Sequence, residues 1–151
     1  GLIPIVAYNY GARNRARITE AYKTGVVTAI VIMAIGTAIF YVFTRELLFL
    51  FDATEQMLEI GVPALRIVSI CFVFAGYGIS CSAMFQALGN GIYSLIVSAT
   101  RQLLFLVPAA YLLSLTGNLT LVWFAFVIAE AASMVVTTLF LRRIFKKKLV
   151  F

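Results

Sequence analysis

The amino-acid sequence predicts an all-α, polytopic transmembrane helix bundle, and three observations carry that prediction. Hydrophobic residues make up 63% of the chain and charged residues 12%, with a mean hydropathy of +1.04, whereas a soluble domain is roughly 45–50% apolar and about 25% charged. Uncharged stretches of about 20 residues, the length that crosses a bilayer, recur along the chain. The basic residues gather in two blocks, Arg13–Lys23 and Arg142–Lys148. A chain of this kind requires lipid as its solvent.

The first segment, residues 1–12, is expected to be the end of a preceding transmembrane helix, because the chain starts without methionine inside an apolar run. The chain is expected to leave the membrane at the polar corner Asn9–Gly11. Residues 13–23 carry four basic side chains and are predicted to form a basic cytoplasmic loop, since cytoplasmic loops are enriched in lysine and arginine.

Residues 24–43 contain no charged side chain and predict the first complete span. Residues 44–66 are predicted to form an outer loop and an interfacial helix. Within them, Asp52 is expected to cap that helix as the first residue of an Asp-Ala-Thr-Glu capping box, and Pro63 is expected to kink it at the membrane surface.

Two further apolar runs are predicted to cross the membrane on either side of a Gly-Asn-Gly turn: residues 67–88, which are uncharged, and residues 92–115, whose one charged residue is Arg101. The second run leaves two alternatives open. Either the span includes Arg101 and buries it, or the part within the membrane begins at Gln102. Pro108 is expected to kink this helix in both cases.

The last predicted span is residues 119–141, and residues 142–151 are predicted to form a basic cytoplasmic tail. With the first basic block inside, an even number of crossings returns the second block to the same side, as the distribution of lysine and arginine requires. The cations therefore act as topology signals in this reading. Nucleic-acid binding, which needs a basic face on a folded soluble module, is not expected.

Glu130 is the acidic residue within the predicted spans and is the candidate cation- or proton-coupling site. A carboxylate at the bilayer centre costs about 2.5–3.5 kcal/mol on insertion scales, so it should face a bundle interior, face a wet cavity or be protonated. The alternative is a structural acid tied to another helix. Arg101 is its candidate partner, although for Arg101 taken alone we prefer the alternative of a long side chain that snorkels to the inner headgroups.

Tyr77 and Gln86, in the run 67–88, are candidate cavity-lining or partner residues, and helix–helix hydrogen bonding is the alternative for each. The sequence contains no histidine, no phosphate-binding loop and no nucleophile–base set. Cys71 and Cys81 are expected to be free thiols within the membrane. We therefore expect no enzyme activity, no catalytic residue, no metal site and no cofactor other than a coupling Na⁺ or H⁺.

Several motifs together resemble the multidrug and toxic compound extrusion (MATE) transporter family. The segment Pro-Ile-Val-Ala-Tyr-Asn-Tyr-Gly-Ala-Arg-Asn, which starts at Pro4, is similar to the family's Pro-x4-Asn-x-Gly-Ala-x-Asn signature. The segment Phe85–Asn90 resembles the end of the family's tenth helix. Arg101-Gln102 with the later Val-Pro and Tyr-Leu pairs resembles the eleventh helix, and the tryptophan–Glu130 helix with its basic end resembles the twelfth.

The resemblance implies that the chain is the C-terminal portion of a two-lobe (6+6) transporter, from the end of helix 8 through helix 12. It implies export of small amphipathic or cationic compounds by Na⁺ or H⁺ antiport through alternating access. The implied partners are membrane lipid and the N-terminal lobe, and the implied location is a bacterial inner membrane. Pro4, Asn9 and Gly11 would form a structural corner, with Gly11 turning the chain at low steric cost.

Two other functions remain open at this point. A flippase for lipid-linked oligosaccharides or polysaccharides belongs to the same superfamily, although such proteins tend to have a more cationic cavity. A membrane structural subunit without transport activity is the other alternative. Some members of the resembled family carry a carboxylate on the tenth helix, and residues 67–88 contain none. Tyr77 lies near the expected position, and Glu130 is the residue that could substitute.

Overall fold

The computed structural model describes residues 1–150, and all the regular structure in this range is helical. Each segment is named here by its label and bounds: α1 Leu2–Gly11, α2 Arg15–Val42, α3 Thr44–Phe49, α4 Glu55–Ser69, α5 Cys71–Ala87, α6 Gly91–Ala99, the π-helical segment η1 Thr100–Leu106, α7 Val107–Ser114 and α8 Leu119–Lys148. Three helical rods are long and apolar enough to cross a membrane, namely α2, the continuous rod Gly91–Ser114, and α8, and α4 with α5 makes a fourth if the bent pair is one span.

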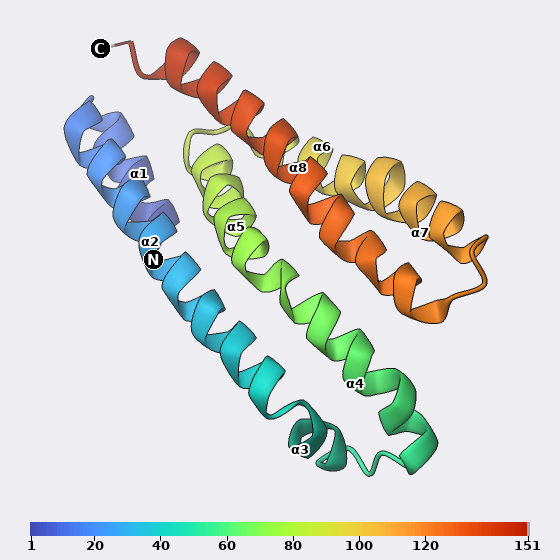
Figure 1. Cartoon of the computed structure of the whole chain (residues 1–151). Coiled ribbons are helices and arrows are strands. Elements are labelled where there is room, and N and C mark those ends of the chain that lie inside the picture. The colour runs from blue at the N-terminus through green and yellow to red at the C-terminus, as the bar shows by residue number, and fades with distance from the viewer. Residues whose placement is uncertain (151) are drawn as a thin grey trace.

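The long rods lie side by side in a row (Figure 1). Helix α2 packs against α5, α5 packs against α8, and α8 packs against the rod formed by α6, η1 and α7. The short helix α1 packs on α2 and α5. The turn between α1 and α2 and the last turns of α8 lie at the same end of the molecule, opposite α3 (Figure 1).

A cluster of buried hydrophobic residues lies at that same end of the bundle. Val6, Ile18, Met84, Phe85 and Ile144 are buried there in one cluster contributed by α1, α2, α5 and α8. Most of α2, by contrast, exposes large apolar side chains, and the apolar window of this helix has no buried residues. Apolar exposure of this extent is compatible with lipid or with contact to further helices.

The helices extend past the predicted spans at the basic end. Residues 13–23 were predicted as a loop, but Arg15–Lys23 form the first turns of α2, and the side chain of Asn14 caps that helix by accepting from the main-chain nitrogen of Arg17 at 3.1 Å. The predicted tail is likewise helical as far as Lys148, because α8 contains neither proline nor glycine to end it. The last residue of that predicted tail, Phe151, lies outside the described residues.

The predicted outer segment contains two helices, α3 and α4, rather than one interfacial helix. The capping prediction is wrong by two residues, because Thr54, not Asp52, accepts from the main-chain nitrogen of Met57, at 3.3 Å. Asp52 instead adopts a left-handed turn conformation with φ of 54°. The bend is also displaced from Pro63: α4 and α5 meet at 43° around Ile70. At this break the carbonyl oxygen of Ser69 lies 2.9 Å from the hydroxyl of Thr37 on α2, which lies at the same distance from the carbonyl of Met33 in its own helix.

Candidate functional site: a charge-paired cleft

A cleft of about 330 Å³ opens between α5, α6, η1 and α8. Its polar lining comes from one residue or a few residues of each of these helices, so the cleft exists only when they pack together. The lining residues are Ile3, Gly78, Ile79, Ser82, Ala83, Gln86, Ser94, Val97, Ser98, Arg101, Glu130 and Ser133.

An ion pair occupies one wall of this cleft. The guanidinium Nη1 of Arg101 donates to Glu130 Oε1 at 2.7 Å, and the two side chains are 39% and 16% exposed. A short, charge-assisted contact of this kind is stronger than a neutral hydrogen bond, and in a water-poor site it offsets part of the cost of burying the carboxylate. The alternative in which Arg101 snorkels away to the headgroups is not the arrangement observed.

The helical hairpin explains why these two residues meet. Arg101 lies in η1, and Glu130 lies in α8, a similar number of residues on either side of the turn that joins the two antiparallel rods. The rod Gly91–Ser114 is continuous through Arg101. Whether the part within the membrane includes Arg101 or begins at Gln102 stays a prediction. Pairing two opposite charges at one depth satisfies both of them within the bundle.

The backbone around Arg101 is irregular. Thr100–Leu106 form a π-helical segment, and Pro108 follows at the start of α7. Proline has no main-chain N–H and its ring clashes with the carbonyl four residues earlier, so a local shift from i→i−4 to i→i−5 bonding accommodates it. The irregularity predicted at Pro108 therefore takes the form of a π-helical segment that contains Arg101. Such segments occur frequently at functional sites.

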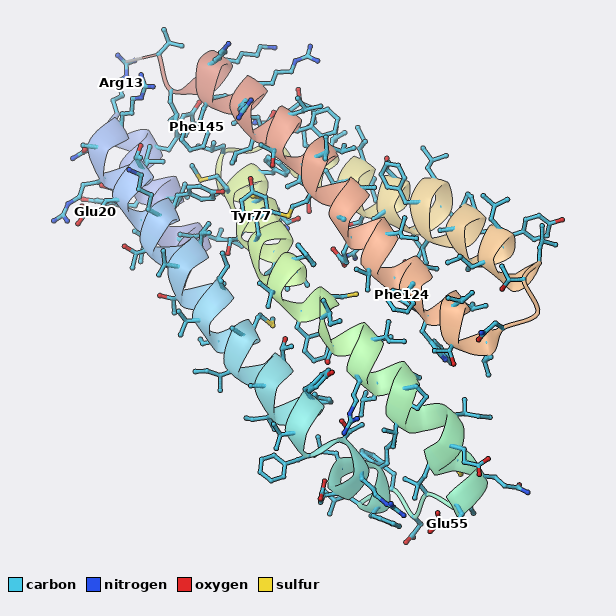
Figure 2. The ribbon with its side chains drawn as sticks, viewed as in Figure 1. Arg13, Glu20, Glu55, Tyr77, Phe124 and Phe145 are labelled. Atoms are coloured by element: carbon cyan, nitrogen blue, oxygen red, sulfur yellow. The ribbon has the colours of Figure 1, made fainter. Side chains whose placement is uncertain are left out.

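The remaining predicted site residues separate into two groups. Gln86 lines the cleft, and its Nε2 donates to Ser94 Oγ at 3.4 Å. Tyr77 does not line it; its hydroxyl lies 2.9 Å from Thr138 Oγ1. Because the Thr138 hydroxyl already donates to the carbonyl of Met134, Tyr77 is the donor in this pair. Tyr77 therefore connects α5 to α8 (Figure 2).

The predicted corner lies outside the cleft. The side-chain amide of Asn9 donates to the carbonyl of Ile5 at 2.8 Å, within α1. Gly11 was expected to make the turn, but it is the last residue of α1 and its φ is not positive; Arg13 has the left-handed conformation, with φ of 53°. That part of the prediction is wrong, because the helix continues through the glycine. Pro4 lies in the first turns of α1, where a missing N–H leaves no helical bond unmade.

Sequence analysis missed three serines of the cleft: Ser94, Ser98 and Ser133. A signal was present, since Ser94 and Ser98 are one helical turn apart and lead to Arg101, and Ser133 follows Glu130 by nearly one turn. Serine is common in packed membrane helices, so the spacing alone did not distinguish a cleft from a helix contact. Among residues 1–150, no group of three or more histidine, cysteine or acidic side chains is arranged to hold a metal ion.

The fold and the cleft define a class of protein: a multi-pass, α-helical membrane protein whose helices line a small cleft with a partly buried charge pair. Comparison with known proteins supplies the family. The family model described as MatE matches residues 1–112, and the chain belongs to this family of multidrug and toxic compound extrusion transporters.

Individual relatives agree with the family assignment. The chain is 27% identical over 130 residues to the multidrug export protein MepA of Staphylococcus haemolyticus, covering 86% of the chain and 28% of that protein. A solved multidrug resistance MATE family transporter of the MOP superfamily in its inward-facing conformation superimposes with a TM-score of 0.90 at 27% identity, over 97% of the chain and 34% of that structure. An outward-facing structure of such a transporter gives a TM-score of 0.89, also at 27% identity, over 97% of the chain and 33% of that structure.

The chain therefore spans about a third of the length of the relatives it matches. The described helices correspond to one contiguous part of such a transporter. The activity of a complete transporter is consequently a proposal for this chain.

Proposed function

We propose that the full-length protein is a secondary active exporter that expels small amphipathic or cationic compounds in exchange for Na⁺ or H⁺. The single observation that carries this proposal is the Glu130 carboxylate, 16% exposed and bonded to Arg101 at 2.7 Å within a polar cleft. Similarity to proteins named as multidrug export proteins supports export as the activity. An intramembrane acid at a helix interface is a favourable position for ion coupling.

Glu130 would act by exchanging its cationic partner. In the structure described here the partner is the Arg101 guanidinium. A proton, a sodium ion or the cationic group of a substrate can each take its place, because each neutralises the carboxylate. Exchange of this kind makes occupancy by the coupling ion and occupancy by the substrate mutually exclusive, which is the requirement for antiport.

Alternating access is the proposed transport cycle. Both the inward-facing and the outward-facing structures match the chain almost equally well, with TM-scores of 0.90 and 0.89. Near-equal likeness to the two states supports a cycle in which these helices behave as one body that moves against the rest of the transporter. The implied partner in that movement is the N-terminal lobe.

We also propose a bacterial inner membrane as the location, with both basic blocks, and therefore the C-terminus, on the cytoplasmic side. The clustering of nine basic residues at one end of the bundle supports this orientation. Lipid surrounds the exposed apolar face of α2 in this arrangement.

The test is transport by the full-length protein in sealed vesicles, with a cationic dye as substrate and an imposed Na⁺ or proton gradient. Glu130→Gln is expected to lower gradient-driven efflux much more than it lowers membrane expression. Glu59→Gln, which alters an exposed acid on α4, is the matched control and should leave efflux unchanged. Equal loss of efflux and expression in Glu130→Gln, or no loss of either, would contradict the coupling role.

The charge of the cleft favours an exporter over a flippase for lipid-linked sugars. Arg101 is the cation among the residues that line it, and its guanidinium is bonded to Glu130. A lipid-linked phosphate would need uncompensated positive charge at this position. Dye efflux that follows the imposed gradient supports the exporter; movement of a lipid-linked sugar without dye efflux would indicate the flippase, and neither activity would indicate a structural subunit.

A further inference from the structure

The two basic blocks, far apart in the sequence, form one surface in the folded protein. Segments 13–23 and 142–148 together carry nine basic side chains and one acidic side chain, Glu20. That carboxylate already bridges to Arg17 at 3.1 Å. All of the basic residues in these segments except Lys148 are exposed. We call this set of nine cations the basic end surface.

Apolar and aromatic contacts hold the two blocks together. The rings of Tyr22 on α2 and Phe145 on α8 meet edge to face, with centroids 5.9 Å apart. Lys148 Nζ lies 5.9 Å from the ring centroid of Tyr10 on α1. Ile18 and Ile144, which alternate with the cations, are buried in the same core cluster. The fold therefore brings like charges together through packing that does not itself neutralise them (Figure 2).

Helix electrostatics account for only one of the two blocks. Lys146, Lys147 and Lys148 lie in the last turn of α8, where the helix dipole favours cations. Arg15 and Arg17 lie at the beginning of α2, where no acidic residue occupies the first turn and the dipole disfavours cations. Arg17 has Glu20 of the same helix as its partner, at 3.1 Å. Arg15 gains nothing from the dipole of α2 and is exposed, so its charge faces the surroundings.

The opposite end of the bundle shows the contrasting arrangement. Arg45 there lies 3.6 Å from Glu55 and over the ring of Phe49. Arg66 lies over the ring of Tyr41 and donates to Thr44. Cations at that end have partners within the chain, whereas the basic end surface has nine cations for one acid.

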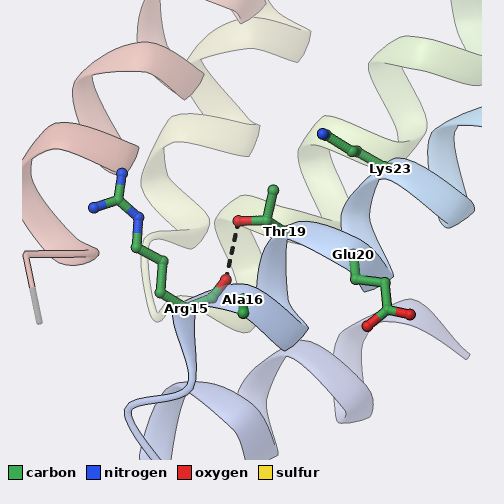
Figure 3. Close-up of a pocket in the computed structure, with 5 residues that line it drawn as sticks. All are labelled: Arg15, Ala16, Thr19, Glu20 and Lys23. Atoms are coloured by element: carbon green, nitrogen blue, oxygen red, sulfur yellow. Dashed lines mark hydrogen bonds between the residues drawn. The ribbon is translucent and has the colours of Figure 1, made fainter.

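A hollow of about 650 Å³ lies within the basic end surface (Figure 3). Arg15 and Lys23 line it from α2, together with Ala16, Thr19 and Glu20. The Thr19 hydroxyl donates its proton to the carbonyl of Arg15 at 2.9 Å, so it is not available to donate to an anionic ligand. The hollow is shallow and all of its lining residues belong to α2; Glu20 among them is bonded to Arg17. An anionic headgroup placed there would lie against Arg15 and Lys23.

We propose that the basic end surface is a binding site for an anionic phospholipid whose headgroup carries two phosphates, one phosphate facing the start of α2 and the other facing the end of α8. Two blocks on different helices, joined by the Tyr22–Phe145 contact, match a ligand with two anionic centres better than one with a single centre. Basic pockets between transmembrane helices on the cytoplasmic side are a recognised setting for such headgroups. This site is separate from the charge-paired cleft and does not depend on the transport reaction.

The test uses the delipidated full-length protein in neutral detergent, with thermal unfolding and native mass spectrometry as readouts. The probes are cardiolipin, phosphatidylglycerol at matched phosphate, phosphatidylcholine and inorganic pyrophosphate. Cardiolipin is expected to raise the unfolding temperature more than any other probe. Arg15→Gln with Lys23→Gln, and separately Lys146→Gln with Lys147→Gln, should each weaken cardiolipin binding roughly tenfold or more.

Two controls separate the site from general charge and from misfolding. Arg15→Lys with Lys23→Arg keeps the charge and should retain binding. Arg45→Gln with Arg66→Gln removes two cations at the other end and should leave the cardiolipin response intact. The proposal is overturned if phosphatidylglycerol at matched phosphate raises the unfolding temperature as much as cardiolipin does, or if pyrophosphate alone reproduces the full effect. It is also overturned if only one of the two block variants, or neither, weakens cardiolipin binding.

Discussion

The hydroxyl of Thr37 on α2 lies 2.9 Å from the main-chain carbonyl oxygen of Ser69, the last residue of α4. The α-helical ladder is interrupted at this point, where α4 and α5 meet at 43°. The same hydroxyl lies 2.9 Å from the carbonyl of Met33, so its one proton is shared between its own helix and the neighbouring one. A donor at a helix break is valuable because water is scarce within a bilayer. One side chain from a neighbouring rod thus stabilises the bend in the α4–α5 span.

We predict that Thr37→Val destabilises the protein by about 0.5–1.5 kcal/mol, the usual range for a hydrogen bond between membrane helices. Thr28→Val on the same helix, where the threonine is exposed, is the control and should have little effect. Chemical unfolding of the full-length protein in mixed micelles measures both. Equal stabilities of the Thr37→Val variant and the parent would show that the contact does not support the bend.

The Arg101–Glu130 pair predicts strong energetic coupling. Arg101→Met leaves the carboxylate in the cleft without its guanidinium, and we expect a loss of about 1–3 kcal/mol in the free energy of unfolding. Adding Glu130→Gln should recover most of that loss, because no charge then remains unpaired.

A double-mutant cycle on these two positions checks that expectation. The interaction energy should reach about 1 kcal/mol or more if the pair is intact in solution. Additive effects of the two substitutions would mean that the ion pair contributes nothing to stability in the full-length protein.

At Gly76, helix α5 lies so close to α2 that little room is left for a side chain. A Cβ added there would lie 3.2 Å from the carbonyl oxygen of Ala29 and 3.1 Å from Cγ of Met33. The main-chain oxygen has little freedom to retreat, so Gly76→Ala is expected to cost about 1–3 kcal/mol through overpacking.

Gly78 provides the matched control for this prediction. It lies on the same helix, and a Cβ added there would meet nothing within 4 Å. Gly78→Ala should be neutral or stabilising, because alanine is the better helix former. The unfolding temperature is therefore expected to fall for Gly76→Ala and to stay unchanged or rise for Gly78→Ala, and an equal change in both variants would contradict the close α2–α5 contact.

The turn between α1 and α2 gives a fourth prediction. Arg13 has φ of 53°, a conformation that costs roughly 1–2 kcal/mol for a residue with a Cβ. Arg13→Gly removes that cost and adds some unfolded-state entropy, so a net gain of about 0.5–1 kcal/mol is expected. Gly11→Ala, with open space around the added methyl group, should be tolerated. The reverse order of stability would show that Gly11, not Arg13, requires the special backbone conformation.

Much of the fold could be predicted because membrane spans are visible in composition alone. Residues 24–43 and 119–141 carry at most one charge each, and lipid permits few structures other than helices for such runs. The ends of the helices could not be predicted in the same way. Hydrophobicity marks where the membrane ends, whereas α2 and α8 continue beyond it into charged residues because nothing in the backbone stops them.

The candidate site was predictable in part for a related reason. A lone carboxylate in an otherwise uncharged run makes Glu130 conspicuous, and Arg101 is the cation that lies within the predicted spans. Which serines share their cleft depends on the rotation of each helix about its own axis. That rotation follows from side-chain packing between rods distant in sequence, as at Tyr77 and Thr138.

The sequence by itself determined the solvent of this protein, its helical class and the separation of its cations into two blocks, because these follow from local composition. Tertiary structure alone decided that Arg101 binds Glu130, that the α4–α5 span bends at Ile70 rather than at Pro63, and that Tyr22 and Phe145 join the two basic blocks. Each of these depends on distances between helices, and only the packing of side chains in three dimensions sets those distances.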